Sequence, residues 1–117
     1  MLGALPSHLG RDTPLGRQVR RIGVNIVAHY RPAKIVLFGS MARGDAHEGS
    51  DVDLTVVKER EERFIDRIGA VLEACGAEIE VEALVYTPAE LARLQREGRD
   101  FIVTALAEGI VLYEDQG

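Results

Sequence analysis

The sequence predicts a single α/β (α+β) domain, built on a mixed sheet of three or four strands with helices packed on one face. Two observations lead to this fold class. Short β-branched and aromatic runs alternate along the chain with segments whose apolar residues recur every three or four positions. In addition, the 117 residues suffice for one domain of ordinary size, and no repeat or linker divides them. The composition, 46% hydrophobic and 28% charged, is typical of a globular chain with a hydrophobic core.

Helices are expected where a capping residue precedes a run of helical periodicity. The first begins at Thr13, whose hydroxyl precedes a proline, and ends before the pair Arg31-Pro32. A second covers residues 59–75, which open with acidic residues and carry an apolar stripe. A capping box over residues 87–90 starts a third helix, and a short fourth is expected around residues 101–106.

Strands are expected where apolar and β-branched residues form short runs or alternate with polar ones. Residues 34–38, KIVLF, form a continuous run that ends at a glycine, which is typical of a buried strand. Residues 51–57, DVDLTVV, and residues 78–86, EIEVEALVY, both begin with polar–apolar alternation, and residues 110–113 are expected to form a closing strand. Because the helix over residues 59–75 joins the second and third strands, we expect these two to be neighbours connected by a right-handed crossover.

Composition and charge restrict the class of protein. Residues 1–12 carry no periodic apolar pattern and are expected to be a loose arm, so that residues 13–117 make up the domain. With 14 basic and 19 acidic side chains the net charge is −5, which argues against broad nucleic-acid binding. Cys75 is the single cysteine, and the chain shows neither a signal peptide nor an apolar stretch of the roughly 18 residues that span a membrane. A cytoplasmic protein without a membrane segment is therefore expected.

The loop between the first two strands and the start of the second carry the chemistry-bearing residues. Gly39 allows a backbone to approach a ligand closely, while Ser40 offers a hydroxyl and an N–H to phosphate oxygens. Arg43 would add charge-assisted hydrogen bonds. Asp51 and Asp53 project from the same face of a strand, with Cα atoms about 6–7 Å apart. Hard carboxylate oxygens at this spacing suit Mg²⁺, which commonly bridges to substrate phosphates, so the implied ligand is a nucleoside triphosphate.

These residues also carry a family resemblance. Gly39-Ser40, ten further residues and then Asp51-Val52-Asp53 resemble the G-S-x10-D-x-D motif of the DNA polymerase beta-type nucleotidyltransferase superfamily. The longer string FGSMARGDAHEGSDVDL is similar to its small prokaryotic branch, the minimal nucleotidyltransferases. The resemblance implies a nucleotidyltransferase-like domain in which both aspartates bind Mg²⁺ and a third carboxylate comes from a following strand. That position corresponds to Glu82, where many members carry aspartate. The sequence leaves open whether Glu82 binds metal, acts as a base or does neither.

The same resemblance implies an activity and a partner. The expected reaction is Mg²⁺-dependent transfer of AMP from ATP to a hydroxyl acceptor, with release of pyrophosphate. Small members of the branch are often paired with a helical toxin of the HEPN type, so the leading hypothesis is an antitoxin that modifies its partner protein. Two alternatives remain: an antitoxin that masks its partner by contact alone, and a nucleotidyltransferase for small molecules such as aminoglycosides. The oligomeric state is left open.

Overall fold

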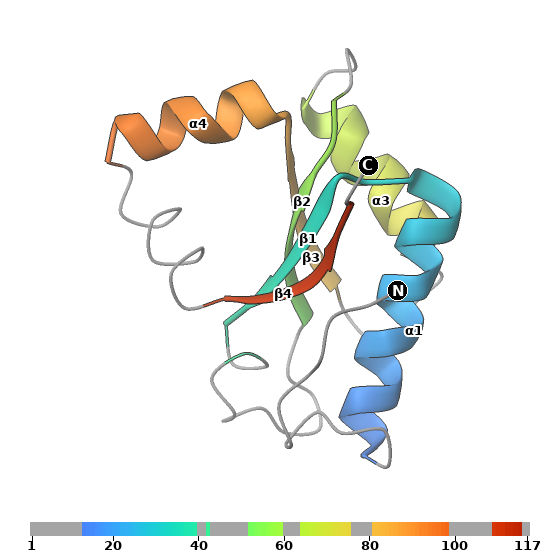
Figure 1. Ribbon diagram of the computed structural model, residues 1–117. Coiled ribbons are helices and arrows are strands. Elements are labelled where there is room, and N and C mark those ends of the chain that lie inside the picture. Colours follow the sequence, from blue (N-terminus) through green and yellow to red (C-terminus); the bar gives the residue numbers. More distant parts are fainter. Residues whose placement is uncertain are drawn as a thin grey trace.

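Three helices and four strands make up the described part of the chain in the computed structural model (Figure 1). In chain order they are α1 (Pro14–Tyr30), β1 (Lys34–Phe38), β2 (Val52–Val57), α3 (Phe64–Cys75), β3 (Val81–Tyr86), α4 (Pro88–Arg96) and β4 (Ile110–Glu114). The structure describes residues 13–39, 42, 52–59, 64–75, 81–98 and 109–115. The predicted arm at residues 1–12 and the short helix around residues 101–106 lie outside these ranges. Within them, each expected helix and strand is confirmed.

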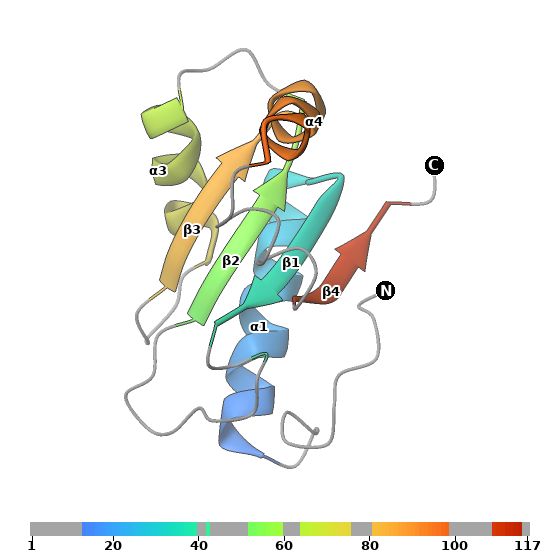
Figure 2. The same cartoon turned by 90° about the vertical axis from the view of Figure 1, so that its left-hand side faces the viewer.

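The four strands form one mixed sheet in the order β3-β2-β1-β4 (Figure 2). Strand β1 runs antiparallel to both of its neighbours, whereas β2 and β3 run parallel. Parallel neighbours need a connection that returns to the starting end of the sheet, and α3 lies between them in the chain. The prediction that the strands of residues 51–57 and 78–86 are neighbours is therefore confirmed.

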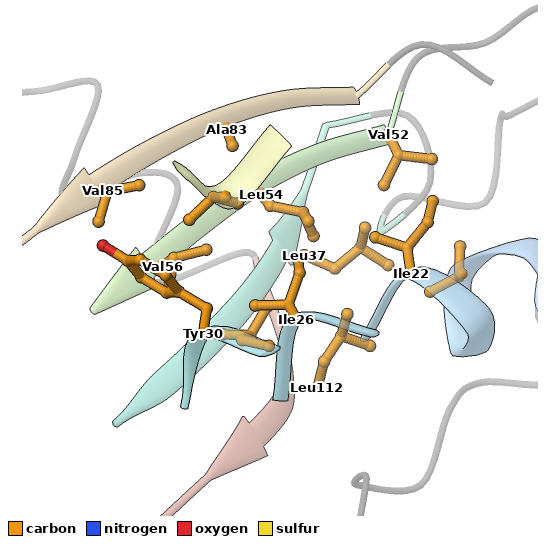
Figure 3. Close-up of a cluster of buried hydrophobic side chains, with 13 residues drawn as sticks. Ile22, Ile26, Tyr30, Leu37, Val52, Leu54, Val56, Ala83, Val85 and Leu112 are labelled. Atoms are coloured by element: carbon orange, nitrogen blue, oxygen red, sulfur yellow. The ribbon is translucent and has the colours of Figure 1, made fainter. Parts of the chain in front are cut away.

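Helices α1 and α3 pack side by side on one face of the sheet (Figure 1). Alternation along β2 supplies the core on this side, because Val52, Leu54 and Val56 are all fully buried there (Figure 3). From α1, Ile22 and Ile26 pack into the same cluster at helical spacing. The two helices thus cover one face of the sheet. The odd-numbered residues of β2, among them Asp53, lie on the opposite face.

Helix α4 does not join that layer. It leaves the end of β3 on the other side of the sheet (Figure 1), and none of its residues is fully buried. Its start is as the sequence predicts, since the Thr87 hydroxyl accepts from the Glu90 N–H at 3.1 Å and the Glu90 carboxylate accepts from the Thr87 N–H at 2.8 Å. The capping box fixes where this helix begins, but without a buried face it does not bring the helix onto the core. None of the described helices is long and apolar enough to cross a bilayer.

The two ends of α1 are closed by local contacts. At its start the Thr13 hydroxyl accepts from the Gly16 N–H at 3.0 Å. At its end Arg31 adopts a left-handed conformation, with φ of 54°, directly before a proline. The Lys58 ammonium, just after β2, donates to the carbonyls of Tyr30 and Arg31 and lies 4.7 Å from the centre of the Tyr30 ring. Lys58 therefore links the end of α1 to the end of β2.

Candidate functional site

Three strand ends meet at one end of the sheet and bring the predicted site residues together. Because β1 runs opposite to β2, its last residue, Phe38, pairs with Asp53 near the start of β2. Because β3 runs parallel to β2, Asp53 is also in register with Glu82. Partners in adjacent strands present their side chains on the same face, about 4.8 Å apart. Asp53 and Glu82 are therefore neighbouring carboxylates on the face opposite α1 and α3.

Gly39 forms a close backbone cradle for Asp53. It has a positive φ of 74°, in the left-handed region that glycine adopts readily. A Cβ placed on Gly39 would lie 3.3 Å from Asp53 Cγ and closer still to its Oδ2, well inside van der Waals contact. A residue with a side chain cannot stand there without displacing the Asp53 carboxylate. Gly39 of the predicted motif thus makes room for the Asp53 carboxylate. The sequence had indicated a different role, the close approach of a ligand to the Gly39 backbone.

On the face opposite α1 and α3, β2 carries an accessible polar residue only near its start. Asp53 is half-buried and Glu82 is exposed, so that both can be reached from solvent at the strand ends. One step further along β2, Thr55 is only 1% exposed and lies beside Val36 of β1, which is 2% exposed. Among the described residues the Thr55 hydroxyl finds no hydrogen-bond partner. Along β2, the accessible carboxylate on this face is therefore the one near the start of the strand, Asp53, with Glu82 beside it on β3.

Other predicted site residues lie outside the described ranges. These are Ser40, Arg43 and Asp51, so their contribution to the site stays a prediction. The described residues hold no group of three or more potential metal ligands. Asp53 and Glu82 nevertheless fit a hard divalent cation, since both are carboxylates, they share one face, and one of them is open to solvent. The donor set suits Mg²⁺, and Asp53 and Glu82 are the described residues that would hold it.

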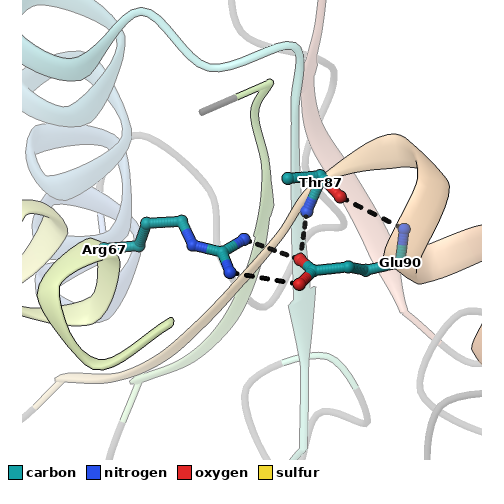
Figure 4. Close-up of polar contacts among 3 residues, drawn as sticks. All are labelled: Arg67, Thr87 and Glu90. Atoms are coloured by element: carbon teal, nitrogen blue, oxygen red, sulfur yellow. Dashed lines mark hydrogen bonds and ion pairs between the residues drawn. The ribbon is translucent and has the colours of Figure 1, made fainter. Parts of the chain in front are cut away.

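The opposite end of β3 carries a second charged cluster, formed by Arg67, Thr87 and Glu90 (Figure 4). The Arg67 guanidinium donates through both terminal nitrogens to the Glu90 carboxylate, at 2.6 and 3.1 Å. Its side chain is only 5% exposed, whereas that of Glu90 is 34% exposed. We call this ion pair with its capping box the Arg67–Glu90 clamp. It joins the first turn of α4 to α3, across the end of the sheet.

Within the clamp, the pKa values of Arg67 and Glu90 shift in the directions that favour the charged forms of both side chains. Hydrogen bonds from Arg67 and from the Thr87 N–H lower the pKa of Glu90 to about 2. The hydrogen bond to Glu90 raises the pKa of Arg67 above its ordinary value, despite the opposing effect of burial. Burial, followed by the nearby charge of Glu90, raises the pKa of Tyr86. The clamp is therefore charged throughout the physiological range of pH.

The sequence predicts Glu90 as a capping residue but does not predict the role of Arg67. A signal was present, because Arg67 stands in the apolar stripe of the helix over residues 59–75, three residues after Phe64 and four before Val71. A charged residue within a buried stripe indicates a buried ion pair. The sequence does not say which acid forms it, since Glu90 lies 23 positions away.

Comparison with known proteins places this arrangement in a family. Residues 24–117 match the model of the family described as "Polymerase beta, Nucleotidyltransferase". The match includes the glycine cradle, Asp53 and Glu82, and it covers most of the chain. The chain belongs to the polymerase beta nucleotidyltransferase family. No curated protein matches the sequence significantly.

A solved structure shares the fold. It is the crystal structure, at 1.40 Å resolution, of a Sulfolobus solfataricus protein described as a "putative nucleotidyltransferase". The two chains superpose with a TM-score of 0.55 over 92% of this chain and 95% of the other, at 18% sequence identity. At this identity the likeness shows the fold alone. It confirms the predicted nucleotidyltransferase-like architecture of a mixed sheet with helices.

Proposed function

We propose that the protein is a Mg²⁺-dependent nucleotidyltransferase that transfers AMP from ATP to a hydroxyl group. The observation that carries this proposal is the register of Asp53 with Glu82, beside Gly39, whose missing side chain leaves room for the Asp53 carboxylate. Two carboxylates on one accessible sheet face are the arrangement that metal-assisted phosphoryl chemistry requires. Membership of the family makes nucleotidyl transfer the reaction class that this arrangement serves.

In the proposed reaction the acceptor oxygen attacks the α-phosphorus, and the bond from that phosphorus to the pyrophosphate oxygen breaks. Pyrophosphate leaves with the electron pair of that bond, and the proton of the hydroxyl passes to a carboxylate. Gly39 leaves room for the Asp53 carboxylate at the end of β1, and the register of β2 with β3 puts Asp53 beside Glu82, so the two carboxylates are positioned together. Glu82 is exposed on the neighbouring strand, and this position suits it to accept the proton. A bound Mg²⁺ supplies neutralisation of phosphate charge and orientation of the reacting oxygens.

The acceptor that we propose is a hydroxyl on a partner protein, a helical toxin of the HEPN type, which would make this chain an antitoxin. This part of the proposal rests on the resemblance of the motif to the minimal nucleotidyltransferases. The supporting feature in the sequence is the string around Gly39 and Ser40 that continues to Asp53. ATP as the donor and Mg²⁺ as the cofactor rest on the same resemblance together with the carboxylate pair.

The test is transfer of label from α-labelled ATP to a helical protein encoded in the neighbouring reading frame, with Mg²⁺ present. Three forms are compared: the wild type, Asp53→Asn, and Glu73→Gln as a control. Glu73 is an exposed acid on α3, on the other side of the sheet, so its replacement makes the same charge change away from the site. We expect label on the partner with the wild type and the control, and none with Asp53→Asn. Binding of the partner without any transfer would contradict catalysis and favour masking by contact.

A further inference from the structure

Thr55 carries a buried hydroxyl that the described part of the chain leaves without a hydrogen-bond partner. Its side chain is 1% exposed, and no described residue lies within hydrogen-bond reach of the hydroxyl oxygen. The residues beside Thr55 in the neighbouring strands are Val36 on β1 and Leu84 on β3, which carry no polar side-chain atom. Because a buried hydroxyl without a partner costs stability, the threonine at this position needs an explanation.

Strand propensity does not explain why residue 55 is a threonine. Valine has nearly the same shape and favours strands equally, and it adds no buried polar atom. Strand β2 carries valine at three other positions, Val52, Val56 and Val57. The backbone of β2 does not serve the hydroxyl either, because the strand lies between β3 and β1 and its N–H and C=O groups point towards them, in the plane of the sheet (Figure 2). The hydroxyl is therefore available to a group on the same face.

The polar residue that precedes Thr55 on this face is Asp53. Because successive residues of a strand alternate between its two faces, Asp53 and Thr55 project from the same face, with Cα atoms about 6–7 Å apart. Gly39 follows Phe38, the partner of Asp53 in β1, and so lies beyond this pair, towards the start of β2. Thr55 lies in the other direction, towards the end of β2. The Asp53 carboxylate thus has Gly39 against its Oδ2 and the Thr55 hydroxyl on the side away from Gly39.

We propose that Thr55 is a positioning residue of the cation site, whose hydroxyl donates a hydrogen bond to the Asp53 carboxylate when that carboxylate holds a cation. This inference rests on the proposed function, because it assigns Thr55 to the same site. A hydroxyl that donates to a carboxylate makes a charge-assisted hydrogen bond. Since Thr55 makes no such bond in the described fold, its free energy would be gained on binding and would add to the affinity for the cation.

Stability and binding should therefore respond differently to loss of the hydroxyl. Without a cation, the Thr55 hydroxyl is a buried polar group with no described partner, so its removal should not lower the free energy of unfolding. With a cation bound, its removal should lower the affinity of the site. A threonine with a structural role alone would show the reverse, a loss of stability with unchanged affinity.

The test compares three variants of the full chain with the wild type. Thr55→Val removes the hydroxyl and keeps the branched shape, whereas Thr55→Ser keeps the hydroxyl and removes a methyl group. Thr87→Val is the matched control, because it makes the same chemical change beyond the other end of β3, where the hydroxyl accepts from the Glu90 N–H. Each form is titrated by calorimetry with the Mg²⁺ complex of α,β-methylene-ATP, an analogue that cannot transfer AMP. Urea unfolding without Mg²⁺ measures the stability of each form.

We expect Thr55→Val to bind the complex roughly tenfold more weakly than the wild type, while its stability without Mg²⁺ is not reduced. Thr55→Ser should bind as the wild type does, although loss of the buried methyl group lowers its stability. Thr87→Val should also bind as the wild type does and should be less stable, because the cap of α4 is lost.

Three results, each with a wild type that binds the complex, would overturn the inference and leave the proposed function standing. The first is equal affinity of the wild type and Thr55→Val. The second is equal weakening by Thr55→Ser and Thr55→Val, which would assign the effect to packing. The third is a lower stability of Thr55→Val without Mg²⁺, which would give the hydroxyl a partner within the fold. No binding by the wild type up to about 1 mM would instead contradict the proposed function, and this inference with it.

Discussion

The two ends of the parallel pair β2–β3 use acidic residues in opposite ways. At one end Asp53 and Glu82 bring like charges side by side on an accessible face. At the other end Glu90 forms a bidentate ion pair with Arg67. The same carboxylate accepts the Thr87 N–H of the capping box. Neighbouring carboxylates oppose folding, whereas the clamp supports it. The unfavourable pairing at the Asp53–Glu82 end is consistent with the proposed cation site, because a bound cation would offset the repulsion between the two carboxylates.

The largest expected effect is at the stabilising end. Replacement Glu90→Ala leaves the buried Arg67 charge without its carboxylate and removes half of the capping box. We expect the free energy of unfolding to fall by about 3 kcal/mol, the lower end of the loss for buried pairs, because the Glu90 side chain is 34% exposed. Urea unfolding followed by circular dichroism measures the loss.

The control for this variant is Glu97→Ala. Glu97 lies 3.9 Å from Arg93 in a pair whose side chains are 45% and 63% exposed. Such an exposed helix pair contributes about 0.3–0.5 kcal/mol. If both variants lost the same small amount, the clamp would be no more than a surface ion pair.

The next effect is at the carboxylate end. Replacement Gly39→Ala strains a positive φ and drives a Cβ into the Asp53 carboxylate. Gly98→Ala is the matched control, because Gly98 has a φ of 66° but no atom within 4 Å of the added Cβ. Both variants should lose about 1–2 kcal/mol to backbone strain, and Gly39→Ala should lose more, because its Cβ also displaces the Asp53 carboxylate. Equal losses in urea unfolding would show that Gly39 does not hold Asp53.

The smallest effect is the pH dependence of the clamp. The pKa of Glu90 is lowered from 4.5 in the unfolded chain to about 2 in the fold, so its stabilising contribution is complete above pH 4.5. It is lost as the pH falls from 4.5 towards 2, because the carboxyl then takes up a proton. The difference in unfolding free energy between the wild type and Glu90→Gln should therefore be constant near neutral pH and shrink below 4.5. A difference that stayed the same near pH 2 would contradict the lowered pKa.

The same contrast explains what the sequence could predict. Helix α1 and strand β1 lie where they were expected, since their limits depend on adjacent residues such as Thr13 and Gly39. The neighbourhood of Asp53 and Glu82 followed from the motif and from the crossover that a parallel pair requires. These predictions depend on residues adjacent in the sequence, or on the general rule that parallel strands are joined by a crossover.

The clamp and the placement of α4 could not be predicted in this way. The capping box at Thr87 sets the start of α4, but the ion pair that joins this helix to α3 is made by Arg67, which comes from a different helix. The cradle at Gly39 likewise depends on an aspartate in another strand. Each of these features brings together residues that are distant in the sequence. The spacing of apolar and polar residues along the chain does not predict such side-chain contacts.

Thermal unfolding with and without Mg²⁺ and ATP tests directly whether Asp53 and Glu82 form a cation and nucleotide site. Ligands that bind only the folded state raise the Tm, and the rise grows with the logarithm of the ligand concentration once that exceeds the Kd. We predict that Mg²⁺ with ATP raises the Tm of the wild type and of Glu73→Gln and leaves that of Asp53→Asn unchanged. Superimposed scans for the wild type, or an equal rise for Asp53→Asn, would contradict the claim.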